Sequence, residues 1–266
     1  MTKLEQYFQT KKNVSAFMPY FSLGDPKITF SFDWADALVE GGANILELGI
    51  PFSDPIGDGP VVQRAFTRAF QNQFSFETIF PVAKKIHEAH SEVPLVFMTY
   101  FNPIGKYGLE HFLDHAAESG ISGLILPDMP FDTPESERIF HLGKSRGINL
   151  IHLVTPSTSA KRIKSMRGLT GGFVYYVTSF GVTGERKEFS ADLKDRIEFV
   201  KAELKLPVCA GFGISTPEHA KLMSEFSDGV IIGSAVQKII EEHGNSPEVC
   251  KSRLQEYAKQ IRAAFP

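Results

Sequence analysis

Eight short segments of the chain consist almost entirely of apolar residues, and β-branched and aromatic side chains are frequent among them. A continuous apolar segment, unlike an alternating one, predicts a strand that is covered on both faces in a parallel sheet. The eight predicted strands span residues 16–22, 44–51, 95–101, 123–129, 149–155, 173–179, 207–213 and 229–235.

Helical patterns separate these segments. Residues 28–42 place apolar side chains along one stripe and end at Gly41–Gly42, which is typical of a helix C-terminus. Thr133 and Thr216 each precede a proline, an arrangement that favours a threonine N-cap with proline at the first helical position. Residues 246–265 show another amphipathic pattern and predict a further helix.

Eight strand–helix units predict a (β/α)8 or TIM barrel, an α/β fold that typically takes ~250 residues. The sequence has 266 residues, and no linker or low-complexity segment divides it. We therefore expect one barrel domain over residues 1–266, with an extra N-terminal helix. A doubly wound open sheet would carry G-x-G-x-x-G after its first strand, and residues 20–27, "YFSLGDPK", do not match that pattern.

Composition limits the classes of partner and the compartment. A formal net charge of −3 offers no basic surface for nucleic acid. Two cysteines do not form a disulfide framework, and a reducing compartment is the simplest interpretation. The N-terminal residues lack the apolar core of a signal peptide, and no segment approaches the ~20 apolar residues of a membrane span. We expect a soluble, cytoplasmic protein.

Glycine-bearing loops follow the sixth, seventh and eighth predicted strands. In TIM barrels the active site lies at the C-terminal ends of the strands, and the last two loops often hold a phosphate. The last loop opens a helix at Gly233–Ser234, where free N–H groups and the helix dipole favour an anion. One such glycine could simply make a tight turn. Three neighbouring loops of this kind predict a phosphorylated small-molecule substrate.

The residue types in the predicted strands narrow the chemistry. A Schiff-base aldolase needs a lysine in the barrel mouth, and none of the eight segments contains one. His152 is the only histidine within them, so no metal site is predicted, and Cys209 lies in an apolar segment where a thiol is normally inert. Acid–base chemistry by carboxylates remains. The available carboxylates are Asp25, Glu47, Asp54, Asp58 and Asp128.

Glu47 lies inside the second predicted strand, where an unpaired charge is costly. It shares one face of the strand with Ile45 and Gly49, and this is the inner face if Leu46 and Leu48 point to the helices. Burial raises the pKa of a glutamate and lets it hold or donate a proton near neutral pH. A structural role and a catalytic role are equally compatible with this position.

Asp58 lies in a loop rich in proline and glycine, which could bring a second carboxylate over the barrel mouth. The competing interpretation is an N-cap for a helix that begins near Pro60. Asp54 has a similar interpretation as a turn residue. Asp128 is flanked by prolines at a strand end, where fixing a loop or an interface is as well supported as catalysis.

The segment "ELGIPFSDPIGDGP" (47–60) resembles the signature of the tryptophan synthase alpha-subunit family. The similarity extends over essentially the whole chain, with "YFSLGDP" (20–26), "GVTG" (181–184), "AGFGIS" (210–215) and "GSAVQKII" (233–240) in the family's order and spacing. The resemblance implies a lyase of tryptophan biosynthesis that cleaves indole-3-glycerol phosphate to indole and glyceraldehyde 3-phosphate. It implies that Glu47 is the acid–base residue, that Asp58 stabilises positive charge on the indole N–H, and that Thr183 holds Asp58 in position.

The resemblance also implies the binding residues and the partner. Phosphate would be held at Gly184, Gly213, Gly233 and Ser234. The indole pocket would be lined by Tyr20, Met98, Ile125, Tyr175 and Phe212. The family's partner is a beta subunit that uses pyridoxal phosphate in an α2β2 heterotetramer, and no cofactor or metal is expected in this chain. The docking surface would include Asp54, Pro55, Asn102 and Pro103.

Two alternative functions remain open. One is a partner protein that acts mainly as an allosteric activator of the beta subunit. The other is a different phosphate-binding barrel enzyme, such as an indole-glycerol-phosphate synthase, which would be expected to carry a catalytic lysine on a strand. Independently of that choice, the composition of residues 180–189, "FGVTGERKEF", predicts a mobile lid.

Overall fold

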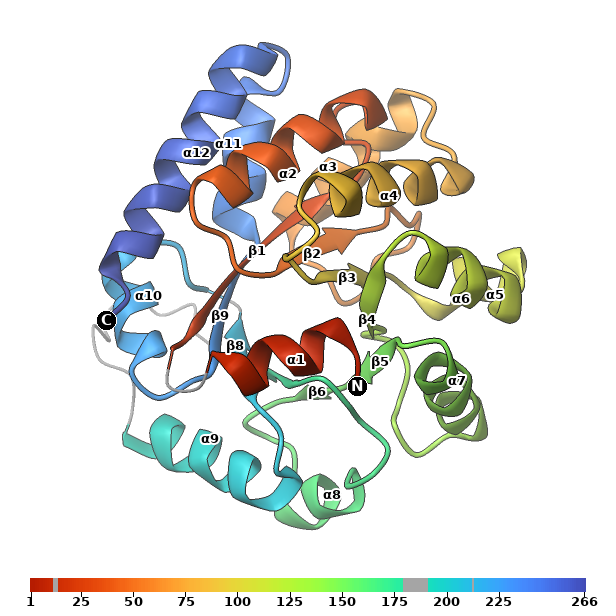
Figure 1. Cartoon of the computed structure of the whole chain (residues 1–266), viewed down its shortest axis with the longest axis vertical. Helices are drawn as coiled ribbons and strands as arrows, with labels where there is room; N and C mark the ends of the chain where they lie inside the picture. The colour runs from red at the N-terminus through yellow and green to blue at the C-terminus, as the bar shows by residue number, and fades with distance from the viewer. Residues whose placement is uncertain (12–13, 179–190, 212) are drawn as a thin grey trace.

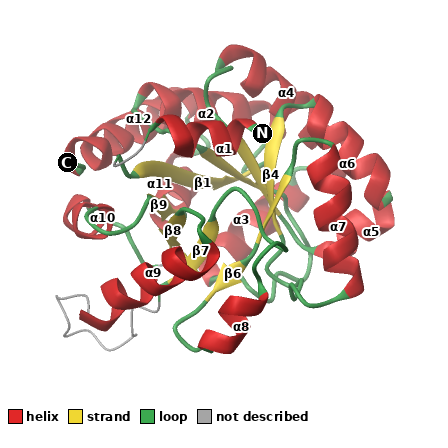
Figure 2. Ribbon diagram, turned by 60° about the horizontal axis from the view of Figure 1, so that its bottom comes forward, coloured by secondary structure: helices red, strands yellow, loops and turns green. Residues whose placement is uncertain are grey.

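The computed structural model describes residues 1–11, 14–178, 191–211 and 213–266, and for 191–192 the backbone alone. Within them, nine parallel strands form a nearly closed barrel that helices surround (Figures 1 and 2). Around the barrel the strand order is β5-β4-β3-β2-β1-β9-β8-β7-β6, and the predicted TIM-barrel class is confirmed. The strands are β1 (Ala16–Ser22), β2 (Leu46–Gly49), β3 (Leu95–Met98), β4 (Ile121–Ile125), β5 (Asn149–Ile151), β6 (Leu153–Val154), β7 (Val174–Val177), β8 (Val208–Gly211) and β9 (Gly229–Ile232).

Helices follow most strands and pack on the outer face of the barrel (Figure 2). Two short 3-10 helices, η1 (Ile28–Phe30) and η2 (Phe76–Thr78), precede α2 and α4. The α-helices in the described residues are α1 (Lys3–Thr10), α2 (Ser31–Glu40), α3 (Pro60–Gln71), α4 (Ile79–Ala89), α5 (Phe101–Tyr107), α6 (Leu109–Glu118), α7 (Pro134–Ser145), α8 (Ala160–Ser165), α9 (Ala191–Leu204), α10 (Pro217–Ser224), α11 (Ser234–His243) and α12 (Pro247–Ala264).

The fifth predicted strand is divided in two, which is why nine strands replace the expected eight. β5 pairs with β4, whereas β6 pairs with β7. His152 lies between them, and its carbonyl accepts a hydrogen bond from the Tyr175 amide at 3.1 Å. The segment therefore changes its neighbouring strand at His152. The chain continues in the same direction, but its hydrogen bonds to a neighbouring strand are interrupted at this residue.

The strands separate two apolar layers, and β2 illustrates the alternation. Leu46 and Leu48 belong to the layer between the strands and the surrounding helices. Ile45 belongs to a second layer inside the barrel, with residues such as Met18 and Val96. Since successive side chains of a strand point to opposite faces, Glu47 points into the barrel, as the sequence predicts.

Helix α1 closes the N-terminal end of the barrel. Leu4 is fully buried and belongs to the inner apolar layer. A Cβ built at Gly123 of β4 would lie 3.2 Å from the Leu4 side chain, which shows how closely the helix approaches the strands. The Asn149 amide also donates to Glu5 of α1 at 2.9 Å. With this end covered, the opposite end is the one available to a ligand.

The predicted helix starts are confirmed. The Thr133 hydroxyl accepts from the Ser136 amide at 3.2 Å, and the Thr216 hydroxyl accepts from the His219 amide at 3.3 Å. Each threonine thus satisfies one of the free amides at the start of its helix. These helices, α7 and α10, begin at the prolines that follow.

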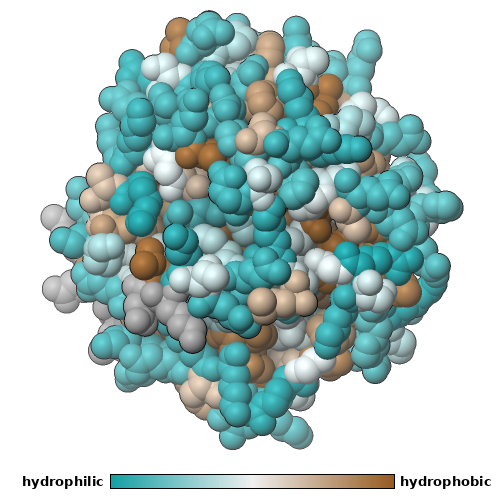
Figure 3. All heavy atoms as spheres, viewed as in Figure 1, coloured by the Kyte–Doolittle hydropathy of each residue, from teal (hydrophilic) through white to brown (hydrophobic). Residues whose placement is uncertain are grey.

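No helix within the described ranges is both long and apolar enough to cross a membrane. The face of the molecule in Figure 3 is mainly hydrophilic, with small and separate hydrophobic patches. The buried apolar side chains are gathered in the two layers on either side of the strands.

Candidate active site

Glu47 is a buried carboxyl group in the interior of the barrel. Its side chain is 1% exposed, and neither carboxylate oxygen has a hydrogen-bond partner among the described residues. Burial, together with the nearby charge of Asp58, raises the pKa of Glu47 to about 8. A carboxyl group in this state is largely protonated at neutral pH and can both donate and accept a proton.

The raised pKa of Glu47 predicts a pH-dependent stability. Because about 8 exceeds the ordinary value of 4.5, the stabilisation from Glu47 is full below pH 4.5 and is lost as the pH rises to about 8. Relative to a Glu47→Gln variant, the free energy of unfolding of the wild type should fall by up to about 5 kcal/mol across this range. Urea denaturation at a series of pH values measures the difference, and a constant difference would contradict the raised pKa.

Aromatic side chains surround Glu47. Tyr20 is its register partner on β1, and Tyr20 and Tyr175 are both buried in the inner layer. Burial raises the pKa values of both tyrosines well above the usual range of a tyrosine, so both hydroxyl groups are neutral. The Tyr20 ring covers Gly49 and the Tyr175 ring covers Gly211, where an added Cβ would collide with them. The glycines at these strand ends therefore make room for the rings.

Met98 and Ile125 complete the apolar wall that the structure describes. Both belong to the same inner layer as Tyr20 and Tyr175, and both lie at the C-terminal ends of their strands, β3 and β4. Four of the five residues predicted to line the indole pocket thus lie together in the inner layer. The fifth, Phe212, lies outside the described residues.

Asp58 is held by Tyr100, a residue that the sequence analysis did not identify. The Tyr100 hydroxyl donates to the Asp58 carboxylate at 2.7 Å and accepts from the Gly57 amide at 2.9 Å. Burial raises the pKa of Tyr100, as does its hydrogen bond to Asp58, so the hydroxyl keeps its proton. Tyr100 lies two residues after the end of β3, and only its position near a strand end could have suggested a role.

The interpretation of Asp58 as a helix N-cap is wrong. Helix α3 begins at Pro60 with Gly59 as its N-cap, and no side chain caps it. The Asp58 carboxylate accepts instead from Tyr100, and burial raises its pKa although this hydrogen bond acts in the opposite direction. Because the charge of Asp58 also raises the pKa of Glu47, the two carboxyl groups are electrostatically coupled across the barrel mouth.

The described part of the predicted phosphate site lies at the ends of neighbouring strands. β8 and β9 pair in parallel, and Gly213 and Gly233 follow them. Gly213 has a φ of +76°, a conformation that favours glycine. Gly233 is the N-cap of α11, which begins at Ser234, and a Cβ there would lie 3.2 Å from the Tyr20 ring. The helix terminus thus borders the aromatic pocket.

Some predicted residues fall where the structure is not described. Thr183 and Gly184 lie within residues 179–190, as does the predicted lid over residues 180–189. The predicted roles of these residues, like that of Phe212, stay predictions.

The other carboxylates have structural partners. Asp128 accepts from the Phe101 amide at 3.1 Å and so binds the first turn of α5, in agreement with a loop-fixing role. Asp25 forms an ion pair with Arg68.

His152 is buried beside the Ser136 hydroxyl at 3.3 Å, and burial lowers its pKa to about 4. Within the described ranges, no group of three or more His, Cys, Asp and Glu side chains could hold a metal ion.

The predicted docking residues lie at the same end of the barrel. Asp54 and Asn102 are exposed, whereas Pro55 and Pro103 are partly buried. Ile56, next to Pro55, is 85% exposed, which is unusual for a large apolar side chain. The structure therefore presents these residues on the surface of the loop before α3 and on α5.

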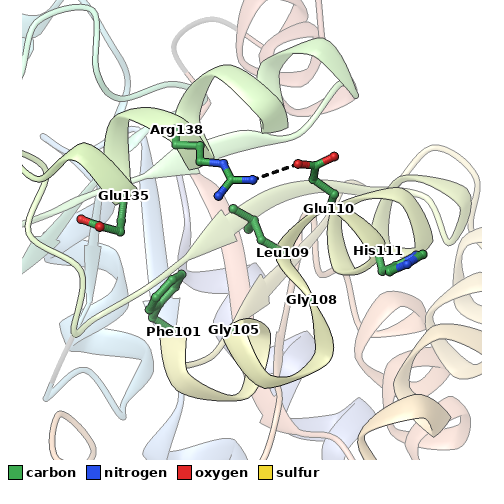
Figure 4. A pocket seen from close by; sticks show the side chains of 8 residues that line it. All are labelled: Phe101, Gly105, Gly108, Leu109, Glu110, His111, Glu135 and Arg138. Carbon is green, nitrogen blue, oxygen red and sulfur yellow. Dashed lines mark hydrogen bonds and ion pairs between the residues drawn. The ribbon is translucent and has the colours of Figure 1, made fainter.

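A groove of about 390 Å³ lies beside α5. Figure 4 shows the ion pair between Arg138 of α7 and Glu110 of α6 at its rim, with an N–O distance of 2.9 Å. The groove is lined by Phe101, Gly105, Gly108, Leu109, Glu110, His111, Glu135 and Arg138. Phe101 and Gly105 of this lining belong to α5, the short helix that also carries Asn102 and Pro103.

Comparisons with known proteins agree with the geometry. Residues 7–266 match the sequence model of the tryptophan synthase alpha chain family. A tryptophan synthase alpha chain from Leptospira biflexa is 54% identical over 265 residues, and 100% of each chain is covered. One from Lacticaseibacillus casei is 40% identical, with 99% of this chain and 96% of the relative covered.

A solved structure shows the same fold. The crystal structure of tryptophan synthase subunit alpha from Legionella pneumophila superposes with a TM-score of 0.90 at 32% identity, and 100% of this chain and 98% of that chain are covered. The resemblance in the sequence motifs is confirmed: the chain belongs to the tryptophan synthase alpha chain family.

Proposed function

We propose that Glu47 and Asp58 cleave indole-3-glycerol phosphate to indole and glyceraldehyde 3-phosphate by carboxylate acid–base catalysis. As a member of its family, the chain is a lyase of tryptophan biosynthesis and the alpha subunit of tryptophan synthase. The supporting observation is the state of Glu47, which is buried, lacks a hydrogen-bond partner in the described residues, and has a raised pKa. A purely structural buried carboxyl group would normally be paired.

The proposed reaction needs one proton donor and one proton acceptor, and Glu47 serves as both. Protonated Glu47 gives its proton to C3 of the indole ring and converts the ring to an indolenine. The Glu47 carboxylate then takes the proton of the hydroxyl group on the adjacent glycerol carbon, whose oxygen becomes the aldehyde oxygen. The carbon–carbon bond breaks, and its electron pair returns to the ring as the nitrogen loses its positive charge. A pKa of about 8 suits both proton transfers near neutral pH.

Asp58 acts on the other end of the ring. The positive charge of the indolenine resides at the nitrogen, whose N–H can donate to the Asp58 carboxylate. Tyr100 supports this role because its hydroxyl fixes one Asp58 oxygen and leaves the other for the substrate. Thr183 is proposed as a second support for Asp58 when the loop that contains it closes.

A Tyr100→Phe variant tests the support of Asp58. It removes one hydrogen bond to a charged group, so we expect kcat to fall roughly tenfold and the free energy of unfolding to fall by about 1–3 kcal/mol. Steady-state indole release measures the effect. Tyr107→Phe is the matched control, since its hydroxyl bonds His115 at 2.7 Å, away from the predicted site residues. Equal kcat values in the two variants would show that Tyr100 does not assist Asp58.

The proposed substrate site has an apolar part and an anionic part. The indole ring lies between Tyr20, Met98, Ile125, Tyr175 and Phe212. The phosphate lies at Gly184, Gly213, Gly233 and Ser234, where the amides at the start of α11 and the helix dipole favour an anion. The closeness of Gly233 to the Tyr20 ring supports this arrangement, because the two parts of one small substrate must lie side by side.

The family name implies a beta-subunit partner. We propose an α2β2 complex in which pyridoxal phosphate is bound by the beta subunit and none by this chain. The proposed contacts are Asp54, Pro55, Asn102 and Pro103, and exposed Ile56 supports this surface. We further propose that residues 1–266 form one domain and that the protein acts in the cytoplasm, where amino-acid biosynthesis takes place.

An indole-release assay with and without a beta subunit tests the proposal. We expect the chain to release indole from indole-3-glycerol phosphate by itself and faster in the complex. No release in either state would refute the proposed activity. Release in the complex alone, with the Glu47→Gln variant equally active there, would favour a chain that mainly activates its partner.

A further inference from the structure

A buried carboxylate outside the barrel interior joins three elements at the active-site end. Asp25 lies in the loop after β1, and its side chain is fully buried. Arg68 of α3 binds it through two parallel hydrogen bonds, both of 2.8 Å. The side-chain amide of Gln237, in the first turn of α11, donates to the same carboxylate. Asp25 therefore connects α3 to α11.

The connection continues toward the substrate pocket. The Gln237 carbonyl oxygen accepts from the Ser22 amide at 2.9 Å, and the Ser22 hydroxyl lies 3.1 Å from the Tyr20 hydroxyl. Tyr20 in turn is the register partner of Glu47 and lies close to Gly233, where an added Cβ would be 3.2 Å from its ring. A continuous series of hydrogen bonds thus leads from Arg68 to the wall of the pocket.

A second carboxylate, on helix α11, extends the network. Glu241 of α11 accepts from Arg68 at 2.8 Å and from Arg64 of α3 at 2.7 and 2.8 Å. The Arg64 hydrogen bonds, with the charges of both arginines, lower the pKa of Glu241 to about 2. Two arginines of α3 therefore hold two carboxylates, one of which is on α11.

This network is a poor candidate for stability alone. Burial raises the pKa of Asp25 despite the hydrogen bonds from Arg68, so the cost of removing the carboxylate from water exceeds its stabilisation by these hydrogen bonds. Buried ion pairs often contribute little net stability, and fixing one arrangement is their better supported use. These ion pairs fix two helices. Helix α11 begins at the predicted phosphate site, and helix α3 begins two residues after Asp58.

We propose that Asp25 is a positioning residue, which through Arg68 and Gln237 fixes the start of α11 relative to α3 and thereby aligns the phosphate site with Asp58. The inference rests on the proposed phosphate site. Without the Asp25 charge, Arg68 loses its bidentate partner and Gln237 loses its charged acceptor. The Glu241 pairs with Arg64 and Arg68 still join α11 to α3, but the first turn of α11 is held less firmly. The amides at Gly233 and Ser234 are then less well ordered for an anion and less well aligned with the Asp58 loop, so inorganic phosphate and the whole substrate both bind less tightly.

An Asp25→Asn variant tests this inference in the complex with the beta subunit. We expect the KM for indole-3-glycerol phosphate to rise about tenfold and kcat to change less than about threefold. Calorimetric titration of the full chain should show a similar loss of affinity for inorganic phosphate. A merely structural role would lower the fraction of active protein, which reduces the apparent kcat and leaves both KM and the phosphate affinity unchanged.

Two further variants complete the experiment. Asp36→Asn is the matched control. Asp36 of α2 accepts from Lys251 of α12 at 2.7 Å and from His90, the residue after α4, at 3.1 Å, and these contacts lie outside the network. Its KM and phosphate affinity should equal those of the wild type. Gln237→Met keeps the Asp25–Arg68 pair and removes the hydrogen bonds of the Gln237 side chain to Asp25 and to the Ser22 amide, which join α11 to β1 and the loop after it. It should reproduce the rise in KM, and it decides the question if Asp25→Asn does not fold.

The outcomes separate this inference from the proposed activity. A rise in KM with a parallel loss of phosphate affinity supports the positioning role. An unchanged KM, or a raised KM with unchanged phosphate affinity, overturns it. If the wild type itself cleaves no substrate, the proposed activity fails, and the phosphate titration of Asp25→Asn against Asp36→Asn still decides whether Asp25 positions an anion site.

Discussion

Replacing Glu47 by glutamine is expected to reduce indole release by a factor of about 10²–10⁴, the usual contribution of a positioned acid–base group. Glutamine has nearly the same shape but no titratable proton, so it can neither protonate C3 of the indole ring nor accept the proton of the glycerol hydroxyl. Since both proposed proton transfers use this one side chain, the loss should appear in kcat as well as in kcat/KM. Steady-state assays of indole release measure both.

Two controls make the Glu47 result interpretable. The glutamine variant should remain folded, because it removes a buried carboxyl group that has no hydrogen-bond partner in the described residues, and circular dichroism can verify this. A Glu47→Asp variant keeps a carboxyl group at a shorter reach and should retain more activity than the glutamine variant. Turnover of Glu47→Gln within about threefold of the wild type would be incompatible with acid–base catalysis by this residue.

Replacing Asp58 by asparagine is expected to lower kcat by about 10²–10³, as when one group that stabilises transition-state charge is removed. Asparagine can still accept the hydrogen bond from Tyr100, so the loop should keep its place while the negative charge is lost. Loss of that charge also removes one cause of the raised pKa of Glu47. The pH above which activity declines should therefore move down in this variant, and a pH–rate profile measures it.

Asp132→Asn is the matched control for Asp58. Asp132 is an exposed carboxylate in the loop before α7, and it pairs with Arg162 at 2.9 Å. Its replacement changes the net charge equally but leaves the Glu47 surroundings intact, so kcat and the pH–rate profile should not change. If Asp58→Asn behaves like Asp132→Asn, Asp58 has no part in charge stabilisation.

Much of the fold could be predicted because the barrel imposes strong local patterns. Strands covered on both faces must be apolar throughout, and all eight predicted segments overlap a strand of the barrel. Thr133 and Thr216 could be identified as caps because a cap depends on neighbours within three residues. The inward direction of Glu47 followed from the alternation of β2 alone.

Two expectations were wrong, and both concern features that depend on contacts with residues far away in the sequence. The division at His152 arises because its two flanks pair with different strands, β4 and β7, and periodicity carries no information about partners. Asp58 has the local sequence of a helix N-cap, but the Tyr100 hydroxyl from another loop binds its carboxylate. A long-range hydrogen bond overrode a local preference.

The amino-acid sequence by itself determined the barrel class, the family and the identity of the two candidate carboxylates, because these depend on residue types at fixed spacing. Only the tertiary structure decided that Tyr100 holds Asp58, that Glu47 lacks a partner among the described residues and has a raised pKa, and that Asp25 connects α3 to α11. Burial and hydrogen bonding between residues 42 to 212 positions apart set these properties. No local pattern encodes them, since they come into being only when the strands close into a barrel.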